Sequence, residues 1–320
     1  MKPRILLTGK TGQLGSELNR LLPKLGEVIA PDRTELDLRE PEQIRQIVRS
    51  TNPQLVVNAA AYTAVDAAET DEANALAVNA KAPRVLAEEA KKIGAVLVHF
   101  STDYVFDGSK KAPYVETDSP NPRNAYGRTK LAGEQGIRES GATHVIFRTS
   151  WVYATHGRNF LLTILRLATE REELKIVADQ VGAPSCALDL AEATTKIVAG
   201  MISDDKSQFA FPEASGTYHM TAAGQTSWYE FAKAILEEAG RAPQSLPWLA
   251  SATKGRPLIA RRVVPISTEE FCSPAPRPVY SVLSNARLRQ VFGVALPDWR
   301  TQLQRCFSPI TSAGILTPAG

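Results

Sequence analysis

The chain has 320 residues, of which 43% are hydrophobic and 22% are charged, and its formal net charge is +3. This composition is ordinary for a globular protein and excludes disordered and fibrous classes, while ~100–200 residues per domain suggests two domains. Basic and acidic residues are interleaved along the chain, so we expect no nucleic-acid partner.

The cysteines point to a reducing compartment. Cys186, Cys272 and Cys306 are odd in number and lie far apart, without a CxxC pair, which argues against a disulfide framework or a zinc site. The first apolar run begins near residue 4 and leaves no room for a signal peptide. No apolar run approaches the ~18 residues of a membrane span. The sequence therefore predicts a cytoplasmic protein that does not enter a membrane.

Apolar runs alternate with amphipathic segments through the first half of the chain. The runs, which we expect to be buried parallel strands, cover 4–8, 27–30, 55–60, 95–102 and 144–152. The segments between them carry apolar residues three and four positions apart, as helices do, and cover 14–22, 41–50, 73–93, 124–137 and 159–170. Strands joined by helices predict an α/β fold with a doubly wound parallel sheet of Rossmann type.

The second half of the chain is less regular. We expect a further strand at 174–179, a helix at 189–202 and an amphipathic helix at 227–240, but the alternation weakens after about residue 205. The pattern predicts a dinucleotide-binding domain over 1–155, which also receives part of 174–200. A smaller mixed substrate domain is expected over 156–310, interleaved with the first, and residues 311–320 are expected to form a tail.

A glycine-rich turn follows the first predicted strand. The segment TGKTGQLGSEL, residues 8–18, lacks the glycine that a triphosphate-binding loop needs, because Arg4 stands at that position. A strand, a glycine turn and a helix are what a dinucleotide pyrophosphate requires, since glycine lets backbone amides approach the phosphates. The cofactor contacts expected in this turn are Gly9, Thr11, Gly12, Gln13, Leu14 and Gly15.

Residues after the next two strands extend the predicted cofactor site. Asp32 follows Gly15 by 17 residues, close to the ~20 of an acid that binds an adenosine ribose. Its neighbour Arg33 suits a 2′-phosphate instead, so the choice between NAD and NADP stays open. Further expected contacts are Asp37, Leu38, Ala59, Ala60, Ala61 and Thr63.

A tyrosine and a lysine follow the strand that ends at Thr102. Tyr126 and Lys130 are four positions apart, so they share one face of a helix. The lysine ammonium is expected to lower the phenol pKa from ~10 toward neutrality, which suits proton transfer. The spacing therefore predicts an acid–base pair.

The segments GKTGQLG, NAAAYTAVD, STDYVF and YGRTK together resemble the extended short-chain dehydrogenases/reductases, over about residues 4–300. FRTSWVY, DQVGAPS and PRPVYSVLSN resemble a nucleotide-sugar reductase of that family. The resemblance implies that NADPH or NADH reduces the C4 ketone of a dTDP-linked 6-deoxy-4-ketohexose to give dTDP-L-rhamnose. It implies that Tyr126 is the proton donor, that Lys130 lowers its pKa and binds the nicotinamide ribose, and that Thr102 holds the carbonyl oxygen. The implied substrate contacts are Thr63, Val65, Thr102, Asp103, Trp151, Asn159, Gln180 and Arg277.

Other activities of related proteins stay open. A 4,6-dehydratase needs a second acid after Asp103, where this chain has Tyr104, whereas a 4-epimerase would use the same tyrosine and lysine. A non-catalytic subunit resembling the β subunit of methionine adenosyltransferase would have no chemical need of the catalytic residues.

The resemblance also raises the question of a metal-bridged dimer. Some family members bind Mg²⁺ through glutamates at a dimer contact; Glu17 matches the first of these, but Leu188 and Arg300 stand at the other positions. A cation in that cluster repels a divalent metal. We therefore expect no metal, and a monomer or a homodimer.

Overall fold

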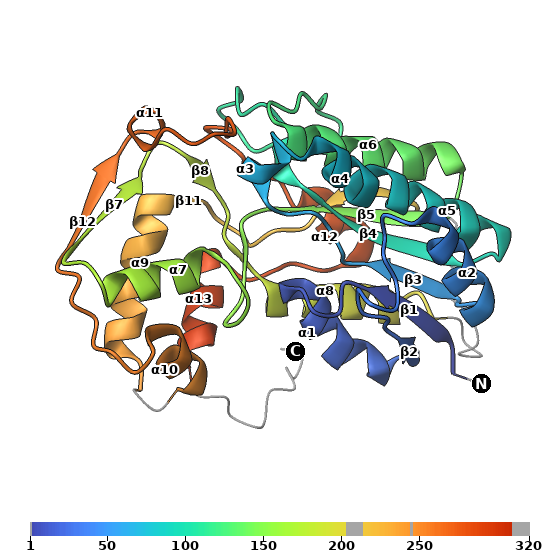
Figure 1. Cartoon of the computed structure of the whole chain (residues 1–320), viewed down its shortest axis with the longest axis horizontal. Coiled ribbons are helices and arrows are strands. Elements are labelled where there is room, and N and C mark those ends of the chain that lie inside the picture. The colour runs from blue at the N-terminus through green and yellow to red at the C-terminus, as the bar shows by residue number, and fades with distance from the viewer. Residues whose placement is uncertain (1, 203–213, 244–245, 309–320) are drawn as a thin grey trace.

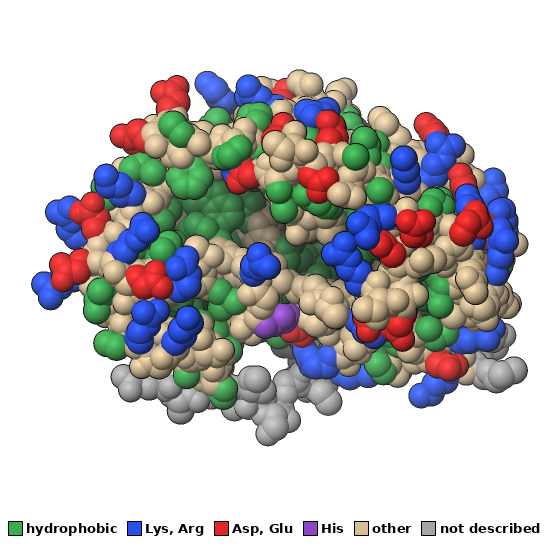
Figure 2. All heavy atoms as spheres, viewed as in Figure 1, with side chains coloured by type: hydrophobic (Ala, Val, Ile, Leu, Met, Phe, Trp, Pro, Cys, Tyr) green, Lys and Arg blue, Asp and Glu red, His purple; other side chains and the backbone are tan. Residues whose placement is uncertain are grey.

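The computed structural model describes residues 2–202, 214–243 and 246–308. It has two lobes, a larger one built around a parallel sheet with helices on both faces and a smaller one made of helices and short strand pairs (Figure 1). The face shown in Figure 2 is hollowed between the lobes, and apolar side chains gather in the hollow. Among the described residues, no helix has both the length and the apolar composition that crossing a membrane requires.

The central sheet has six strands in the order β10-β5-β4-β3-β1-β2, and every neighbouring pair is parallel. The strands are β1 (Arg4–Thr8), β2 (Glu27–Ile29), β3 (Leu55–Asn58), β4 (Val96–Thr102), β5 (His144–Thr149) and β10 (Gly216–His219). Their registers pair Thr8 with Asn58 and Asn58 with His99. The polar ends of β1 and β3 therefore lie side by side, next to β4.

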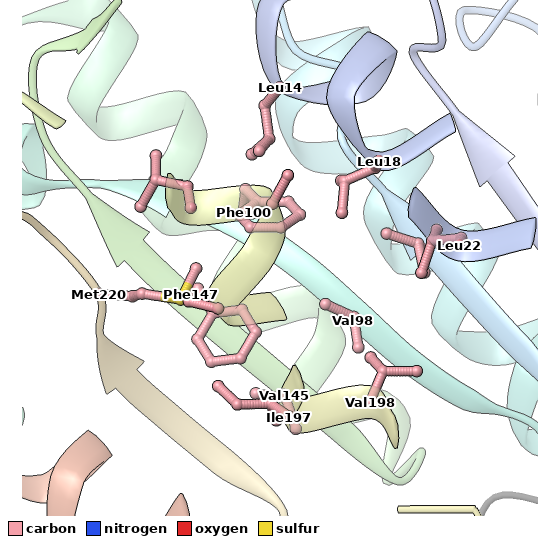
Figure 3. Packing of buried hydrophobic residues seen from close by; sticks show 14 of the residues in the cluster. Leu14, Leu18, Leu22, Val98, Phe100, Val145, Phe147, Ile197, Val198 and Met220 are labelled. Atoms are coloured by element: carbon pink, nitrogen blue, oxygen red, sulfur yellow. The ribbon is translucent and has the colours of Figure 1, made fainter. Parts of the chain in front are cut away.

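Helices cover both faces of this sheet. One face carries α1 (Gln13–Leu21) and α8 (Ala187–Ala199), and the other carries α2 (Pro41–Thr51), α5 (Ala82–Lys92) and α6 (Ala125–Ser140). Helix α1 shows why such segments are helical, because its buried leucines recur at three- and four-residue spacing. Figure 3 shows the side chains that meet under α1 and α8: Leu14, Leu18, Leu22, Val98, Phe100, Val145, Phe147, Ile197, Val198 and Met220.

The smaller lobe packs around Phe231 and its neighbours. Its helices are α7 (Phe160–Ala168), α9 (Trp228–Arg241), α10 (Pro247–Thr253), α11 (Thr268–Phe271) and α13 (Trp299–Phe307). Its strand pairs are β7 (Glu173–Val177) with β12 (Arg262–Ile266), β8 (Val181–Gly182) with β11 (Thr226–Ser227), and β6 (Val152–Tyr153) with β9 (Ser185–Cys186). The linking segments include α3 (Val65–Ala68), α4 (Glu72–Leu76) and α12 (Ala286–Phe292).

The predicted doubly wound parallel sheet is confirmed. The strand expected at 174–179 forms as β7, but it pairs with β12 in the smaller lobe rather than joining the central sheet. The sixth sheet strand is instead β10, which comes from the irregular second half of the chain. Helix α8 packs on α1, so the chain crosses between the lobes more than once. The exact domain boundaries stay a prediction, and the expected tail at 311–320 lies outside the described residues.

Candidate active site

The glycine turn is pressed against the backbone that follows β3. Gly9 has φ +81°, and a Cβ there would lie 2.7 Å from the backbone nitrogen of Ala60. A Cβ at Gly15 would lie 1.9 Å from the carbonyl oxygen of Gly9. These approaches require glycine and bring the turn close to the start of α1, whose N-terminal amides can bind a phosphate. The turn thus has the shape of a dinucleotide pyrophosphate cradle.

The order of the sheet places this cradle at a switch point. The chain leaves β1 toward β2 on one side and returns to β3 on the other side, and ligands bind in the crevice that such a reversal creates. The Thr8 hydroxyl donates to Asn58 Oδ1 at 2.7 Å, and the Ala59 amide donates to the Thr8 carbonyl at 3.2 Å. These bonds fix Ala59, Ala60 and Ala61 beside the glycine turn.

The loop after β2 presents both acids and cations. Asp32 accepts hydrogen bonds from the Thr34 hydroxyl and amide at 2.6 and 2.9 Å, and these bonds lower its pKa. Lys10, inside the glycine turn, lies 3.7 Å from Asp32, and Arg33 is exposed beside it. Further along the loop, the Arg39 side chain lowers the pKa of Asp37 to about 2. Groups suited to a ribose and to a 2′-phosphate therefore lie together, with half-buried Leu38 after them.

A π-helical turn, Ala77–Lys81, fixes the loop after β3. Within it, Asn79 accepts from the Tyr62 amide at 2.8 Å and donates to the Tyr62 carbonyl at 3.0 Å. It also lies 3.2 Å from the Thr129 hydroxyl of α6. The loop that carries exposed Thr63 is thereby tied to the helix that carries Tyr126. Asn79 was not among the predicted site residues. The signal that could have found it is its polar side chain on the apolar face of the predicted helix at 73–93.

Tyr126 and Lys130 lie one turn apart near the start of α6, where they meet the carboxyl end of β4. Asn124 caps this helix by accepting from the Gly127 amide at 2.8 Å, and it donates to the Pro276 carbonyl at 2.8 Å. Lys130 is 1% exposed, and its Nζ donates to the Phe100 carbonyl at 2.6 Å. The predicted spacing thus places phenol and amine at the same strand end.

Burial governs the acidity of both groups. It raises the pKa of Tyr126 to about 12, the neighbouring Thr102 hydroxyl lowers it less, and the charge of Asp103 raises it. Burial also lowers the pKa of Lys130 to about 8. The structure thus differs from the expected lowering of the tyrosine pKa, because Lys130 directs its amine to the Phe100 carbonyl. A phenol with this pKa is fully protonated at neutral pH, as a proton donor must be.

A buried polar chain connects the lysine with the glycine turn. His99 Nε2 lies 3.4 Å from Lys130 Nζ, and its Nδ1 lies 3.0 Å from Asn58 Nδ2. Asn58 in turn accepts from Thr8 at the end of β1. Burial and the Lys130 charge hold the pKa of His99 well below its usual value, so the ring is neutral. His99 and Asn58 were not predicted as site residues, and only the pairing of β1, β3 and β4 reveals their role.

Thr102 and its successors form the floor beside Tyr126. The Thr102 hydroxyl donates to Asp103 at 3.0 Å and accepts from the Tyr104 amide at 3.2 Å. The Tyr104 ring meets the Tyr126 ring edge-on, with centroids 5.8 Å apart. Tyr104 was not predicted as a site residue, because the sequence indicates only that it stands where a dehydratase has a second acid.

Arg277 reaches the same site from the second half of the chain. It forms an ion pair with Asp66 at 2.9 Å, on the short helix α3 that half-buried Val65 begins. Its guanidinium also lies near the Tyr104 phenol; burial raises the pKa of that phenol, and the guanidinium lowers this pKa less. Arg277, which is expected to bind the substrate, thus lies beside the floor formed by Thr102 and its successors, and its ion pair with Asp66 of the larger lobe fixes its position.

Trp151 and Gln180 belong to an aromatic stack in the smaller lobe. The Trp151 ring lies parallel to that of Trp228, with centroids 3.5 Å apart, and a Cβ at Gly182 would lie 2.5 Å from the same indole. Trp228 therefore covers one face of the Trp151 ring, and Gly182 packs closely against the same indole. The Gln180 amide accepts from Trp228 Nε1 at 3.2 Å and donates to Thr268 at 3.0 Å. Trp228 was not predicted as a site residue.

Asn159 lies against the glycine turn, directly before Phe160, whose ring packs on Trp228. Its amide nitrogen donates to Gln13 Oε1 at 2.7 Å and to the Ala154 carbonyl at 2.8 Å, and its oxygen caps α7. The structure thus brings together the predicted catalytic residues with Asp103 and Arg277, and separately joins Asn159 to the glycine turn. Asp32 and Arg33 follow β2 and lie beside Lys10 of the glycine turn.

Two of the three positions compared with a metal-binding cluster carry ion pairs. Glu17 pairs with Arg20 at 2.9 Å, and Arg300 pairs with Glu237 at 2.5 Å. Within 2–202, 214–243 and 246–308, no group of three or more metal-ligating side chains occurs.

Known proteins resemble this chain over nearly its whole length. A family model described as RmlD substrate binding domain matches residues 1–312. A dTDP-4-dehydrorhamnose reductase of Burkholderia thailandensis is 49% identical over 309 residues, which are 97% of this chain and 99% of that protein. A dTDP-4-dehydrorhamnose reductase of Escherichia coli strain K12 is 42% identical over 310 residues, 96% and 97% of the two chains.

A solved structure is similar as well. The crystal structure of dTDP-4-dehydrorhamnose reductase from Bacillus anthracis in complex with NADP has a TM-score of 0.84 and 37% identity, and the match covers 96% of this chain and 99% of that one.

Proposed function

The chain belongs to the RmlD substrate binding domain family, and from that premise we propose that it reduces the C4 ketone of dTDP-4-dehydro-L-rhamnose to dTDP-L-rhamnose with NADPH or NADH. The resemblance drawn from the sequence motifs is confirmed by relatives of up to 49% identity. The chain is therefore an NAD(P)H-dependent oxidoreductase. We further propose that it is cytoplasmic and forms a monomer or a homodimer.

The residues of the first lobe fit a dinucleotide. Gly9 and Gly15 leave a cradle that a Cβ would fill, and the amides at the start of α1 would hold the pyrophosphate. A bound reduced nicotinamide supplies a hydride to the carbonyl carbon. Lys10 and Arg33 would bind a 2′-phosphate, whereas Asp32 would bind a free ribose hydroxyl, and their proximity fits the use of both cofactors.

The catalytic residues complete the reaction at the carbonyl oxygen. Tyr126 donates its phenolic proton to that oxygen as negative charge develops there, and the Thr102 hydroxyl holds the oxygen in place. Lys130, anchored by the Phe100 carbonyl and His99, would bind the nicotinamide ribose. Contact with Trp151 and an ionic contact with Arg277 would position the sugar nucleotide.

One observation carries this proposal: Tyr126, Lys130 and Thr102 meet at the carboxyl end of β4, two strands from the glycine turn after β1. A 4,6-dehydratase needs a second carboxylate where the Tyr104 ring packs on Tyr126. A non-catalytic subunit has no use for this arrangement.

The test is net oxidation of NADPH or NADH in the presence of dTDP-4-dehydro-L-rhamnose, followed by nicotinamide absorbance. Tyr126→Phe is expected to lower kcat by about 10²–10⁴-fold and to leave the Kd of NADPH unchanged, because only the transferred proton is lost. Tyr218→Phe is the matched control, since its phenol donates to the Ala214 carbonyl at the far edge of the sheet. Full activity of Tyr126→Phe, or failure of the wild type to oxidise either cofactor, would overturn the proposal.

A further inference from the structure

Asp103 is a buried carboxyl group next to the reacting centre. It is 2% exposed, and its Oδ1 accepts the hydrogen of the Thr102 hydroxyl at 3.0 Å. Its Oδ2 is buried and has no hydrogen-bond partner among the described residues. A carboxylate oxygen without a donor is costly to bury, whereas the carbonyl oxygen of a neutral acid is much less so. The surroundings therefore favour the protonated form.

The same contact determines what Thr102 can do. A threonine hydroxyl has one hydrogen, and in this structure it is directed at Asp103. The Tyr104 amide donates to the same oxygen at 3.2 Å. While Asp103 accepts that hydrogen, Thr102 has none left for a substrate carbonyl oxygen. The proposed role of Thr102 thus requires that the bond to Asp103 reverse.

We propose that Asp103 is a positioning residue for the reduction: as a neutral acid it donates its hydrogen to the Thr102 hydroxyl, which turns its own hydrogen toward the C4 carbonyl oxygen. This inference rests on the proposed function. Asp103 keeps its proton through the turnover, and the proton that joins the product oxygen comes from Tyr126. Thr102 then stabilises the developing charge from a second side.

The groups around Asp103 set the pH at which this arrangement is lost. Burial raises the pKa of Asp103 to about 7, and the nearby hydroxyls of Ser281 and Thr102 and the backbone amides of Asp103 and Tyr104 lower it less. None of these donors makes a hydrogen bond to Oδ2. The titratable groups that face it are the phenols of Tyr104, on its own turn, and Tyr126, on α6. Both phenols are neutral near pH 7, and the segment before α12 contributes the uncharged Ser281. The neutral acid is therefore present below about pH 7 and is lost as the pH rises.

The first experiment compares pH profiles of kcat/KM for the wild type and Asp103→Asn. The wild type is expected to lose activity above about pH 7, where Asp103 ionises. The asparagine amide can donate to Thr102 at every pH, so in this variant the loss begins no lower than about pH 8, where Lys130 titrates. At about pH 8, one unit above the pKa of Asp103, only about a tenth of the wild type keeps the neutral acid, so the variant is expected to exceed it by about tenfold. An unchanged alkaline limb in Asp103→Asn overturns the proposal.

A second comparison tests whether Asp103 acts through Thr102. Thr102→Val is expected to lower kcat by about 10²-fold, and adding Asp103→Asn to it should then leave the pH profile unchanged. If Asp103→Asn shifts the profile equally in both backgrounds, the coupling is absent. Asp118→Asn is the control. The Asp118 carboxylate forms an ion pair with Lys110, at a distance of 2.6 Å, and is not part of the site, so this variant should keep the wild-type pH profile.

A third measurement needs no turnover. The infrared difference spectrum between wild type and Asp103→Asn is expected to contain a protonated-carboxyl band near pH 6 that disappears as the pH rises through about 7. Absence of this band near pH 6 overturns the inference even if the enzyme is active. Lack of turnover with the keto-sugar, in contrast, overturns the proposed function. The protonation state of Asp103 is still decided by the carboxyl band, which does not depend on turnover.

Discussion

Gly15→Ala is expected to disrupt the cofactor cradle from inside the larger lobe. A Cβ at this position would lie 1.9 Å from the Gly9 carbonyl oxygen and 2.6 Å from the Gly9 carbonyl carbon. The glycine turn cannot simply retreat, because Gly9 is itself pressed against the backbone of Ala60. Real Cβ contacts are not shorter than 3.0 Å, so the turn and the start of α1 must separate by roughly 1 Å.

The size of the effect follows from that displacement. Overpacking of this kind costs about 1–3 kcal/mol of folding free energy. The amides of the turn also move away from the pyrophosphate, and loss of about 1.4 kcal/mol of binding free energy raises the Kd tenfold. We therefore expect Gly15→Ala to remain folded but to bind NADPH at least about tenfold more weakly.

Urea unfolding and a fluorescence titration with NADPH measure the two effects. Gly240→Ala is the matched control, because a Cβ at this position of α9 meets no described atom within 4 Å. Alanine should there stabilise the helix by about 0.5–1 kcal/mol and leave the Kd unchanged. A folded Gly15→Ala protein that binds NADPH with the wild-type Kd would refute the role given to the glycine turn.

Further predictions concern buried polar groups. His99→Leu removes the hydrogen-bond partner of Lys130 and Asn58, so it should lower the free energy of unfolding in urea by about 1–3 kcal/mol and weaken NADPH binding. His99→Gln keeps polar atoms at this position and should be less affected. Equal behaviour of the two variants would contradict this reasoning. Glu89, which Arg49 binds at 2.7 Å, has its pKa lowered to about 2. Its stabilisation is therefore present above the unfolded pKa of ~4.3 and is lost as the pH falls toward 2. Because Arg49 is exposed, Glu89→Gln should cost only about 1–2 kcal/mol near pH 7, and a cost that does not shrink in unfolding experiments near pH 3.5 would contradict the argument.

The sequence alone determined the features that depend on neighbouring residues. Leucine spacing predicts α1, the glycines predict the turn before it, and the interval between Tyr126 and Lys130 places both on one face of α6. These features are local, since backbone periodicity and glycine conformation act over a few residues. The order of strands and helices then predicted the parallel sheet.

Tertiary structure decided the contacts between residues far apart in the chain. No local pattern predicts that β10 completes the sheet, because its four residues join β5 only after the chain has passed through the smaller lobe. Trp151 is similarly covered by Trp228 and Gly182, which reach it from other segments.

The acidity of the site was also decided by packing. The sequence predicts a tyrosine beside a lysine, but burial, not charge, dominates the pKa of Tyr126. The direction of the bond between Thr102 and Asp103 depends on a carboxyl group whose second oxygen is enclosed by the fold. Local spacing brings chemical groups onto one face, whereas the solvent exclusion that sets their protonation arises only when distant segments close over them.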